Sequence, residues 1–274
     1  MKTINSISGG KTSAFMAVHY PADHDVFACV LIDDPWCAPK DAGLVRAVRD
    51  KLGCSFIATA ERDSTLRAVL DLEQKTGRQI AWVAGTSFDA LVKKKKTIPS
   101  KFMRFCTVEM KVNPIMDYCR AYIAPVVSMR IGIRHDEQER AIRIANNNPG
   151  FQKRIVGKSD NGRNIWGKVE WRCVEFPLVE HRITHYEVAQ WAKGSGIDFP
   201  ADSNCVGCFW KPVQQLRKNW DEEAAKMEWF AGQERACGAS FKDGITYDQV
   251  KAIGIQKDFT FGTGAGCSAG YCTD

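Results

Sequence analysis

The sequence predicts an α/β fold, in which helices cover both faces of a mainly parallel sheet. Short apolar runs alternate with segments of helical spacing over the first half of the chain, which is the order that βαβ units produce. Residues 26–33 form a run that is apolar up to its last residue, Asp33, as expected of a buried strand. The first expected strand, residues 2–7, leads through a glycine pair into a helical segment. These observations, with a hydrophobic content of 45%, indicate an ordinary globular α/β protein.

The elements are expected in a definite order along the chain. The expected strands are 2–7, 26–33, 55–60, 81–85, 126–133 and 171–177, and the expected helices are 13–19, 38–52, 65–76 and 186–194. Turn-rich stretches at 146–150 and 158–162 enclose an expected excursion or hairpin. From residue 205 the chain has more cysteine and glycine and few strand signals. We therefore expect an α/β domain over 1–204 and a helical appendage over 205–274 that folds back over the sheet.

The positive charge of the chain is mild but unevenly placed. The net charge is +6, and one stretch holds Lys93, Lys94, Lys95, Lys96, Lys101, Arg104 and Lys111. Such a cluster favours phosphate-bearing partners, a nucleotide or a nucleic acid, although a lysine run is equally well a solvated loop or helix end. No run of eighteen apolar residues and no secretion signal is present. We therefore expect a cytoplasmic protein without a membrane span.

Eleven cysteines stand in this chain. An odd number excludes complete intramolecular pairing, and a reducing compartment disfavours disulfides. Most of the thiols, among them Cys29, Cys54 and Cys119, have apolar neighbours in sequence, and we expect them to be small core residues. Metal binding and catalysis are the options for the others.

The glycine loop, Ser8-Gly9-Gly10-Lys11-Thr12-Ser13, follows the first strand and opens the first helix. Glycines allow a close approach of phosphate oxygens to the backbone, and a helix N-terminus offers unpaired N–H groups. The hydroxyl groups and Lys11 add donors and a positive charge. The spacing differs from that of P-loop NTPases. The loop predicts a phosphate site, with a helix-capping turn as the alternative.

Four motifs stand in one order along the chain. They are the glycine loop, then Arg104-Phe105-Cys106-Thr107 with Lys111 and Pro114, then Gly132-Ile133-Arg134-His135-Asp136-Glu137, then Cys205-Val206-Gly207-Cys208. In this order they resemble the adenine nucleotide alpha-hydrolase (PP-loop) superfamily, and in particular its phosphoadenosine phosphosulfate (PAPS) reductase branch. Compact members of this kind are common in phages and prophages. The resemblance spans residues 4 to 212 and implies a Rossmann-like sheet.

The resemblance implies a role for each motif. The residues implied to hold the phosphates or sulfate of the nucleotide are Ser8, Gly9, Gly10, Lys11, Thr12 and Ser13, with Gly132. Asp33, at the end of the second strand, is implied to lie near the adenosine. Lys111 and Arg134 are implied to clamp anionic oxygens. The alternative for Arg134 is an ion pair with Asp136 or Glu137.

The chain departs from the reductase pattern at two places. Thr12 stands where the superfamily loop usually has aspartate, so the resemblance implies no magnesium-linked role for this residue. Mg²⁺ is left as an open question among the cofactors. The C-terminal Glu-Cys-Gly motif with its histidine is absent, and the chain instead ends with Cys267 and Cys272 in its last residues. A tail cysteine can reach a bound sulfonate and then be reduced, so Cys267 or Cys272 is the candidate nucleophile. The alternative is a tail with inert thiols.

Cys205 and Cys208 have the spacing at which two thiolates converge on one metal. Cys106 is the best third candidate, because family members with a four-iron cluster draw ligands from both motifs. The fourth ligand is open among a tail cysteine, Cys173, Cys237 or none. We expect a 4Fe-4S cluster, with zinc, a redox dithiol or metal-free thiols as the alternatives.

Histidines and tryptophans carry weaker expectations. His135 is expected to line the nucleotide site, while His181 and His185, four residues apart, are expected at the surface near a helix start. The tryptophans expected to pack the appendage rather than to stack on bases are Trp166, Trp171, Trp191, Trp210, Trp220 and Trp229.

Three functions remain open. In the first, a cysteine thiolate attacks the sulfonate of PAPS, and a thioredoxin-type reductant then releases sulfite. In the second, the loop binds ATP, the enzyme adenylylates a nucleic acid, and the cluster delivers sulfur from a cysteine desulfurase, as in tRNA thiolation or DNA phosphorothioation. The third is a nucleotide-binding sensor without turnover. A homodimer is a further expectation.

Overall fold

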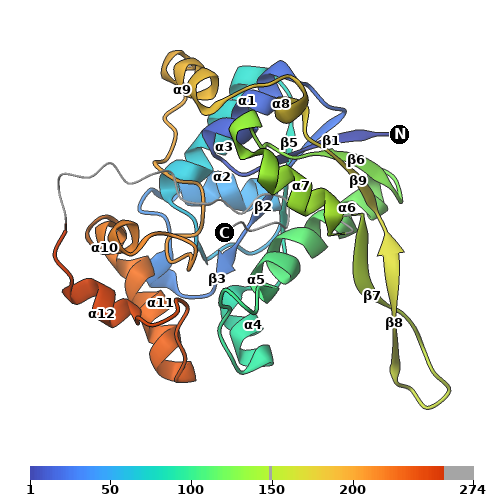
Figure 1. Ribbon diagram of the computed structural model, residues 1–274. Helices are drawn as coiled ribbons and strands as arrows, with labels where there is room; N and C mark the ends of the chain where they lie inside the picture. Colours follow the sequence, from blue (N-terminus) through green and yellow to red (C-terminus); the bar gives the residue numbers. More distant parts are fainter. Residues whose placement is uncertain (148–149, 256–274) are drawn as a thin grey trace.

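The computed structural model describes residues 1–147 and 150–255. Its main sheet has five strands, all parallel, in the order β5-β2-β1-β6-β9 (Figure 1). The strands are β1 (Thr3–Ile7), β2 (His24–Cys29), β5 (Ile80–Ala84), β6 (Val127–Arg130) and β9 (Arg172–Glu175). The predicted α/β class with a mainly parallel sheet is therefore confirmed, and the architecture is consistent with a Rossmann-like fold.

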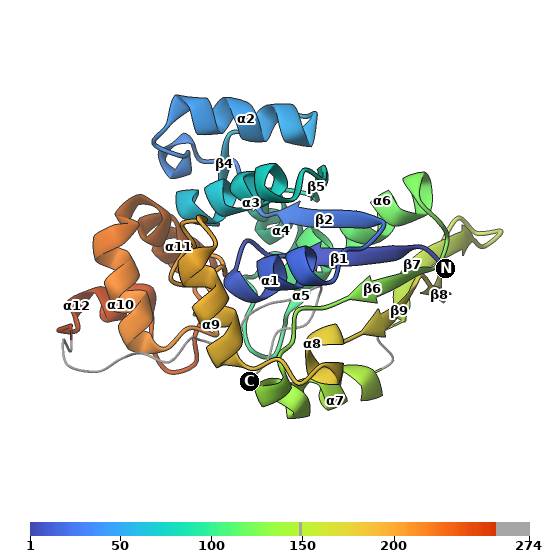
Figure 2. The same cartoon turned by 90° about the horizontal axis from the view of Figure 1, so that it is seen from above.

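Helices cover both faces of this sheet (Figure 2). The helices of this part of the chain are α1 (Lys11–His19), α2 (Ala42–Leu52), α3 (Asp63–Thr76), α4 (Phe88–Lys95), α5 (Phe105–Thr107), α6 (Asn113–Tyr122), α7 (Gln138–Asn146), α8 (Pro177–Glu180) and α9 (His185–Gly194), of which α4 and α5 pack in the core shared with residues after 205. In β2, Phe27 and Cys29 belong to the core with α1, α2 and α3, whereas Val26 and Ala28 belong to the core with α6 and α7. The strand is apolar without alternation because both of its faces are buried.

The apolar run 26–33 is not one strand. β2 ends at Cys29, and a separate short strand, β3 (Leu31–Ile32), follows. At the break, the Val30 N–H donates to the carboxylate of Glu61 at 3.0 Å and the Val30 carbonyl accepts from Ala60. The carboxylate of Glu61 thus takes the place of a neighbouring strand as the acceptor for the Val30 N–H, and the β-ladder of the sheet is interrupted at this residue.

The predicted third strand of the sheet, 55–60, is the clearest error. Only β4 (Ala58–Thr59) forms there, and it pairs antiparallel with β3 outside the parallel sheet. The second helix also starts later than expected, at Ala42, because the Asp41 carboxylate accepts from the Gly43 N–H and caps the helix there. α2 and α3 end where the predicted helices 38–52 and 65–76 end, and Gly53 and Gly77 cap them in the left-handed conformation.

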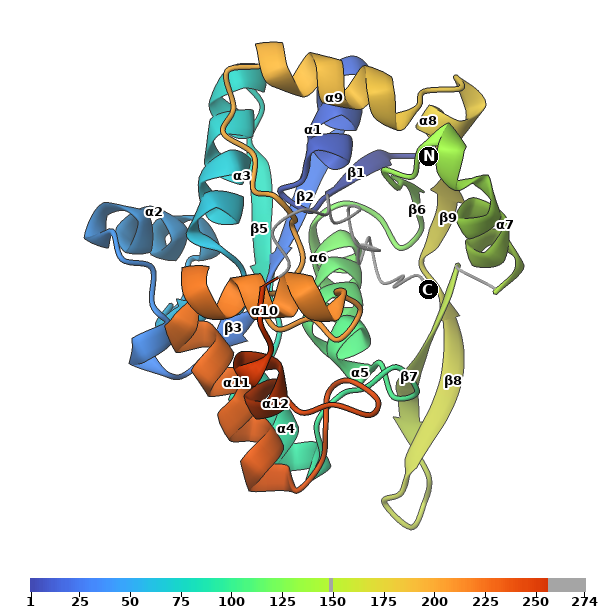
Figure 3. The ribbon, with the colours of Figure 1, turned by 60° about the vertical axis from the view of Figure 1, so that its left-hand side comes forward.

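The described part of the appendage is helical, as expected. It contains α10 (Val213–Glu222), α11 (Ala224–Cys237) and α12 (Tyr247–Ala252). Its apolar residues share one core with Val30, Phe88 and Met110 of the α/β part. The appendage therefore packs directly against the sheet domain around the end of β3 (Figure 3).

The segment 151–170 forms the predicted hairpin, with β7 (Phe151–Lys158) paired antiparallel to β8 (Asn164–Glu170). Trp210, Trp220 and Trp229 pack in the core of the appendage as expected. The expectation was wrong for the other three, because Trp166 is exposed on β8, Trp171 is buried under the main sheet, and Trp191 of α9 packs against Phe15 of α1. Among the thiols, Cys29 and Cys119 are buried as predicted, but Cys54 is exposed.

No described helix is both long enough and apolar enough to cross a membrane.

Candidate functional site

The strand order reverses between β1 and β6. From β1 the chain moves to β2 and β5 on one side, and later to β6 and β9 on the other. In open parallel sheets, ligands bind at such a point, in the crevice outside the carboxyl ends of the strands. The glycine loop leaves β1 there, and Gly132 and Arg134 follow β6 there. Two segments predicted from sequence to hold a nucleotide therefore meet at the crevice that the topology selects.

The glycine loop presents an open helix N-terminus. Gly10 is the N-cap of α1, and no side chain caps the helix. The first turn has no acidic residue and begins with Lys11. The Ser13 hydroxyl donates to the Gly10 carbonyl and accepts from the Ser8 N–H, both at 3.1 Å. These bonds shape the loop and leave the first N–H groups of α1 free to bind an anion.

Close packing explains the glycines of the site. Gly9 has φ +74, and a Cβ there would lie 2.6 Å from Thr65 Cγ2 and 2.9 Å from the Thr65 carbonyl oxygen. A Cβ on Gly10 would lie 2.7 Å from Ser203 Oγ. A Cβ on Gly132 would lie 3.3 Å from the backbone of Ser13. The loop is thus held between α3, the segment at 203 and the end of β6.

Arg134 contacts both the loop and its own neighbours. Its Nη1 donates to Thr12 Oγ1 at 3.1 Å, and its guanidinium forms ion pairs with Asp136 and Glu137, each at 3.2 Å. The alternative ion pairs of Arg134 are therefore present, but the same side chain also reaches the first turn of α1.

His135 lies beside Arg134. Its imidazole ring shares a hydrogen bond with the side-chain amide of Gln138, and its backbone N–H donates to the Ile183 carbonyl.

Asp33 lies elsewhere along the strand ends. Its carboxylate accepts from the Ser87 hydroxyl at 2.5 Å, and its N–H donates to Asp89. It lines a surface hollow with Trp36 and Asp89. Its polar contacts are thus with the start of α4 rather than with the glycine loop, and its role beside an adenosine stays a prediction.

Three cysteines and a lysine line one small pocket, which we call the thiol pocket. Its polar lining is Cys106, Thr107, Lys111, Asn204, Cys205 and Cys208, and its apolar wall comes from Val30, Phe88, Pro99, Met110, Phe209, Phe230 and Phe241. Cys106 lies on α5 and Lys111 on the π-helical turn η2 (Val108–Val112) that follows it. The structure therefore brings together the second and fourth sequence motifs.

The pocket favours uncharged thiols. Burial raises the pKa of Cys106 to about 12, helped by the nearby Cys208. Burial also raises the pKa of Cys205 and Cys208. Removal from water disfavours a thiolate unless a cation compensates it.

Lys111 supplies the positive charge in this pocket. Its burial acts to lower its pKa, but the negative charge of Glu61 and of any ionised thiol among Cys205, Cys208 and Cys106 outweighs burial, and the pKa of Lys111 is raised. Its Nζ lies 3.7 Å from Glu61 Oε1. That oxygen has no hydrogen-bond partner among the described residues, although Glu61 is buried. Glu61 is therefore a buried carboxylate that balances the charge of Lys111.

The described thiols do not form a preformed metal site. The cavity between them measures about 30 Å³, enough for one or two water molecules. Across residues 1–147 and 150–255, no three Cys, His, Asp or Glu side chains are grouped as ligands of one ion. The iron–sulfur cluster and its fourth ligand remain predictions. The predicted tail nucleophiles, Cys267 and Cys272, lie outside the described residues.

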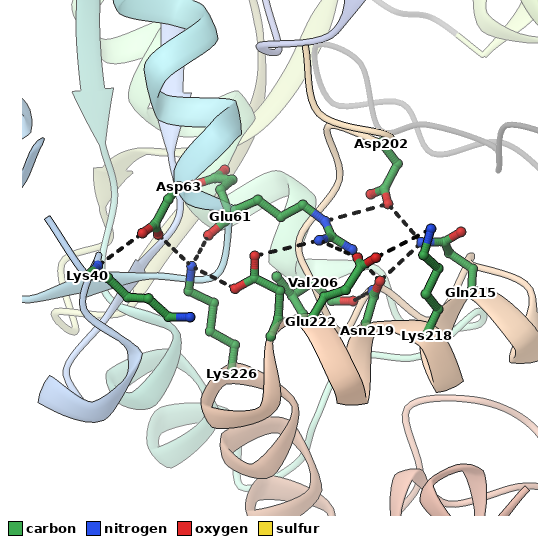
Figure 4. A network of polar contacts seen from close by, with 12 residues as sticks. Lys40, Glu61, Asp63, Asp202, Val206, Gln215, Lys218, Asn219, Glu222 and Lys226 are labelled. Atoms are coloured by element: carbon green, nitrogen blue, oxygen red, sulfur yellow. Dashed lines mark hydrogen bonds and ion pairs between the residues drawn. The ribbon is translucent and has the colours of Figure 1, made fainter. Parts of the chain in front are cut away.

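A buried ionic network fixes the appendage beside the site (Figure 4). Lys226 of α11 donates to the Glu61 carbonyl at 2.6 Å and to Asp63 at 3.2 Å. Arg62, only 6% exposed, bonds to Glu222 at 2.9 Å and to Asn219 of α10. Asn219 in turn donates to the Val206 carbonyl at 2.7 Å. The turn at 205–208 is thus tied to both the appendage and the start of α3.

These network residues were missed from sequence. Lys211, 1% exposed, pairs with Asp202 at 2.6 Å, and both lie next to the predicted cysteine motif. A signal was present in the charged triplet Glu61-Arg62-Asp63 directly after an apolar run. Its partners lie about 140 to 165 residues later in the chain, so only the fold identifies them.

The segment 203–208 joins the two halves of the site. Ser203 Oγ lies 3.5 Å from Ser8 Oγ in the glycine loop, while Asn204, Cys205 and Cys208 line the thiol pocket. Two residues of extended chain span at most about 7 Å. The glycine loop and the nearest pocket cysteine are therefore close neighbours.

No protein-family model matches the chain, and no curated protein matches it with significant sequence similarity.

Proposed function

We propose that this chain binds an adenine nucleotide at the glycine loop and performs sulfur chemistry on it, in the manner of PAPS reductases. The observation that carries the proposal is the segment 203–208, which contacts the glycine loop through Ser203 and the thiol pocket through Cys205. A phosphate site alone fits many enzymes. A phosphate site that adjoins three thiols and a buried lysine fits a nucleotide whose reacting group is sulfur-bearing.

The described residues have distinct tasks in this proposal. The N–H groups of the first turn of α1, with Lys11, bind the phosphate oxygens. Arg134 reaches the same turn through Thr12 and orients an anionic oxygen there. Lys111 places its charge where a sulfonate would extend toward the pocket, and the pocket's aromatic wall excludes water.

The reaction follows from a cysteine thiolate, with Cys267 or Cys272 as the predicted nucleophile. Its sulfur bonds to the sulfur of the sulfonate, the S–O bond to the phosphate breaks, and adenosine bisphosphate leaves with that electron pair. A dithiol reductant of the thioredoxin type then attacks the cysteine sulfur. Sulfite leaves, the cysteine is restored as a thiol, and the reductant becomes a disulfide.

Calorimetric titration of the full chain with PAPS and with ATP tests the binding step. Lys11→Ala removes a charged donor and should weaken nucleotide binding about tenfold or more. The matched control is Lys193→Ala, an exposed lysine at the end of α9, which should leave affinity unchanged. Binding of neither nucleotide, or equal effects of the two variants, would overturn the assignment of the loop.

A second candidate function keeps the loop and changes the acceptor. Here the loop binds ATP and sulfur passes to a nucleic acid, and the exposed lysines Lys153, Lys158 and Lys168 of the hairpin β7–β8 favour this function. Anaerobic purification separates the two: iron-free protein selective for PAPS supports the reductase, and brown protein selective for ATP supports sulfur transfer. Sulfite release that persists in both Cys267→Ser and Cys272→Ser would exclude the tail nucleophile.

A further inference from the structure

The hairpin β7–β8 projects from the body of the protein as a two-stranded ribbon (Figures 1 and 3). Residues directly opposite each other on the two strands share a face. The register pairs Phe151 with Glu170, Lys153 with Lys168, and Ile155 with Trp166. These three pairs lie on one face, and beyond the bulge at Val156 the pair of Lys158 and Asn164 returns to it.

Every residue of this face is exposed along the paired strands. Phe151, Ile155 and Trp166 are 47%, 50% and 56% exposed, and the lysines between them are exposed as well. The opposite face is half-buried at Arg154, which forms an ion pair with Asp117 of α6, although its Val156 and Ile165 are exposed. Apolar side chains of this size, exposed together on a projecting arm, indicate a binding surface.

The charges on this face point to the partner. Lys153 and Lys168 stand directly opposite each other, an arrangement that destabilises a sheet through like-charge repulsion. None of the three lysines of this face has an ion pair with a carboxylate of the described residues, and Glu170 at the base is its one acidic member in the paired strands. Lys153 lies over the Trp166 ring, 5.9 Å from its centroid. Binding of a polyanion relieves the repulsion between Lys153 and Lys168.

We propose that this face, which we call the basic ribbon, binds single-stranded nucleic acid. The lysines contact successive phosphates, and Trp166, with Phe151, stacks on unpaired bases, the combination that single-strand binding surfaces use. This inference does not require the glycine loop to bind a nucleotide, so it stands independently of the proposed function. RNA and DNA single strands share the recognised chemistry.

Fluorescence anisotropy with labelled single-stranded RNA, single-stranded DNA and duplex DNA of one sequence tests the proposal on the full chain. We expect both single strands to bind more tightly than the duplex. Trp166→Ala should lower affinity for the single strand about tenfold, and Trp166→Phe should restore most of it. The single strand that binds with the higher affinity shows whether the ligand is RNA or DNA.

Salt dependence tests the lysines. Lys153→Gln with Lys168→Gln removes two phosphate contacts and should reduce the slope of log affinity against log salt by about 1.4. The matched control, Arg46→Gln with Lys193→Gln, removes the same charge from exposed positions on α2 and α9 and should leave the slope unchanged. Nucleotide affinity at the glycine loop should be equal in all variants.

Three outcomes would overturn the proposal. They are a preference for the duplex, equal slopes for ribbon and control variants, and a change in sedimentation showing that Trp166→Ala instead dissolves a dimer. Thermal unfolding of each variant establishes that the fold is retained.

Discussion

The glycine loop and the thiol pocket adjoin through 203–208, yet they are built in opposite ways. The loop is a continuous stretch whose shape comes from hydrogen bonds within six residues, such as those of Ser13 to Ser8 and Gly10. The pocket gathers side chains from α5, η2, the turn at 205–208 and α11. A local structure is specified by its own residues, whereas an assembled one depends on every element that contributes a wall. Mutations should therefore damage the pocket from a distance but the loop only from close by.

The largest expected effect comes from breaking the ionic network. Arg62→Met leaves Asp202, Glu222 and Glu223 without their shared cation. Because Arg62 is buried, unfolding free energy should fall by about 3 kcal/mol, measured by urea denaturation. The matched control is Arg67→Met, whose ion pair with Asp41 is half exposed, and it should cost at most about 1 kcal/mol. Equal costs would show that the network does not hold the appendage.

Gly9→Ala tests the loop. The substituted residue would need φ near +74 and a Cβ in contact with the Thr65 carbonyl, so we expect a loss of about 2–3 kcal/mol and of nucleotide affinity. Gly53→Ala provides the comparison, since Gly53 has φ +62 with open space around it. It should cost only about 1–2 kcal/mol and leave nucleotide affinity intact. Calorimetry and urea denaturation give the two quantities.

Gly207→Ala tests the pocket. A Cβ at this position would overlap the ring of Phe230, so we expect a destabilisation of about 1–2 kcal/mol and faster alkylation of the pocket thiols. Phe230→Leu in the same chain should restore part of the stability by making room. Nucleotide affinity should change little. A large loss of affinity instead would mean that pocket and loop are one rigid unit.

Ser203→Ala should have the smallest effect. Its 3.5 Å contact with Ser8 is long, so we expect a change in stability within about 0.5 kcal/mol. Affinity for a nucleotide should fall a few-fold, because a hydroxyl donor beside the phosphates is lost. Unfolding and titration measure both on one sample. An affinity equal to that of the unchanged protein would place the ligand away from 203–208.

The local parts of the fold were predictable because each depends on near neighbours in sequence. The strand β1, the glycine loop and α1 follow from one short stretch, and Gly53 and Gly77 end their helices because the left-handed C-cap favours glycine. The prediction of a strand of the main sheet at 55–60 was wrong because apolar composition does not identify the strand with which a segment pairs. Here β4 pairs with the short strand β3, outside the main sheet.

For the site, the sequence by itself predicted the candidate residues: the glycine loop at the start of a helix, Arg134, Lys111 and the three cysteines. Tertiary structure alone decided that these cysteines share a pocket with Lys111 and that Asp33 faces Ser87 instead of the loop. It also decided that Glu61 and Arg62 connect to residues of the appendage. The physical reason is the separation in sequence between the residues that interact. Caps, turns and loops are stabilised by hydrogen bonds between near neighbours in the chain, whereas buried charges and pockets are stabilised by partners that only the folded chain brings together.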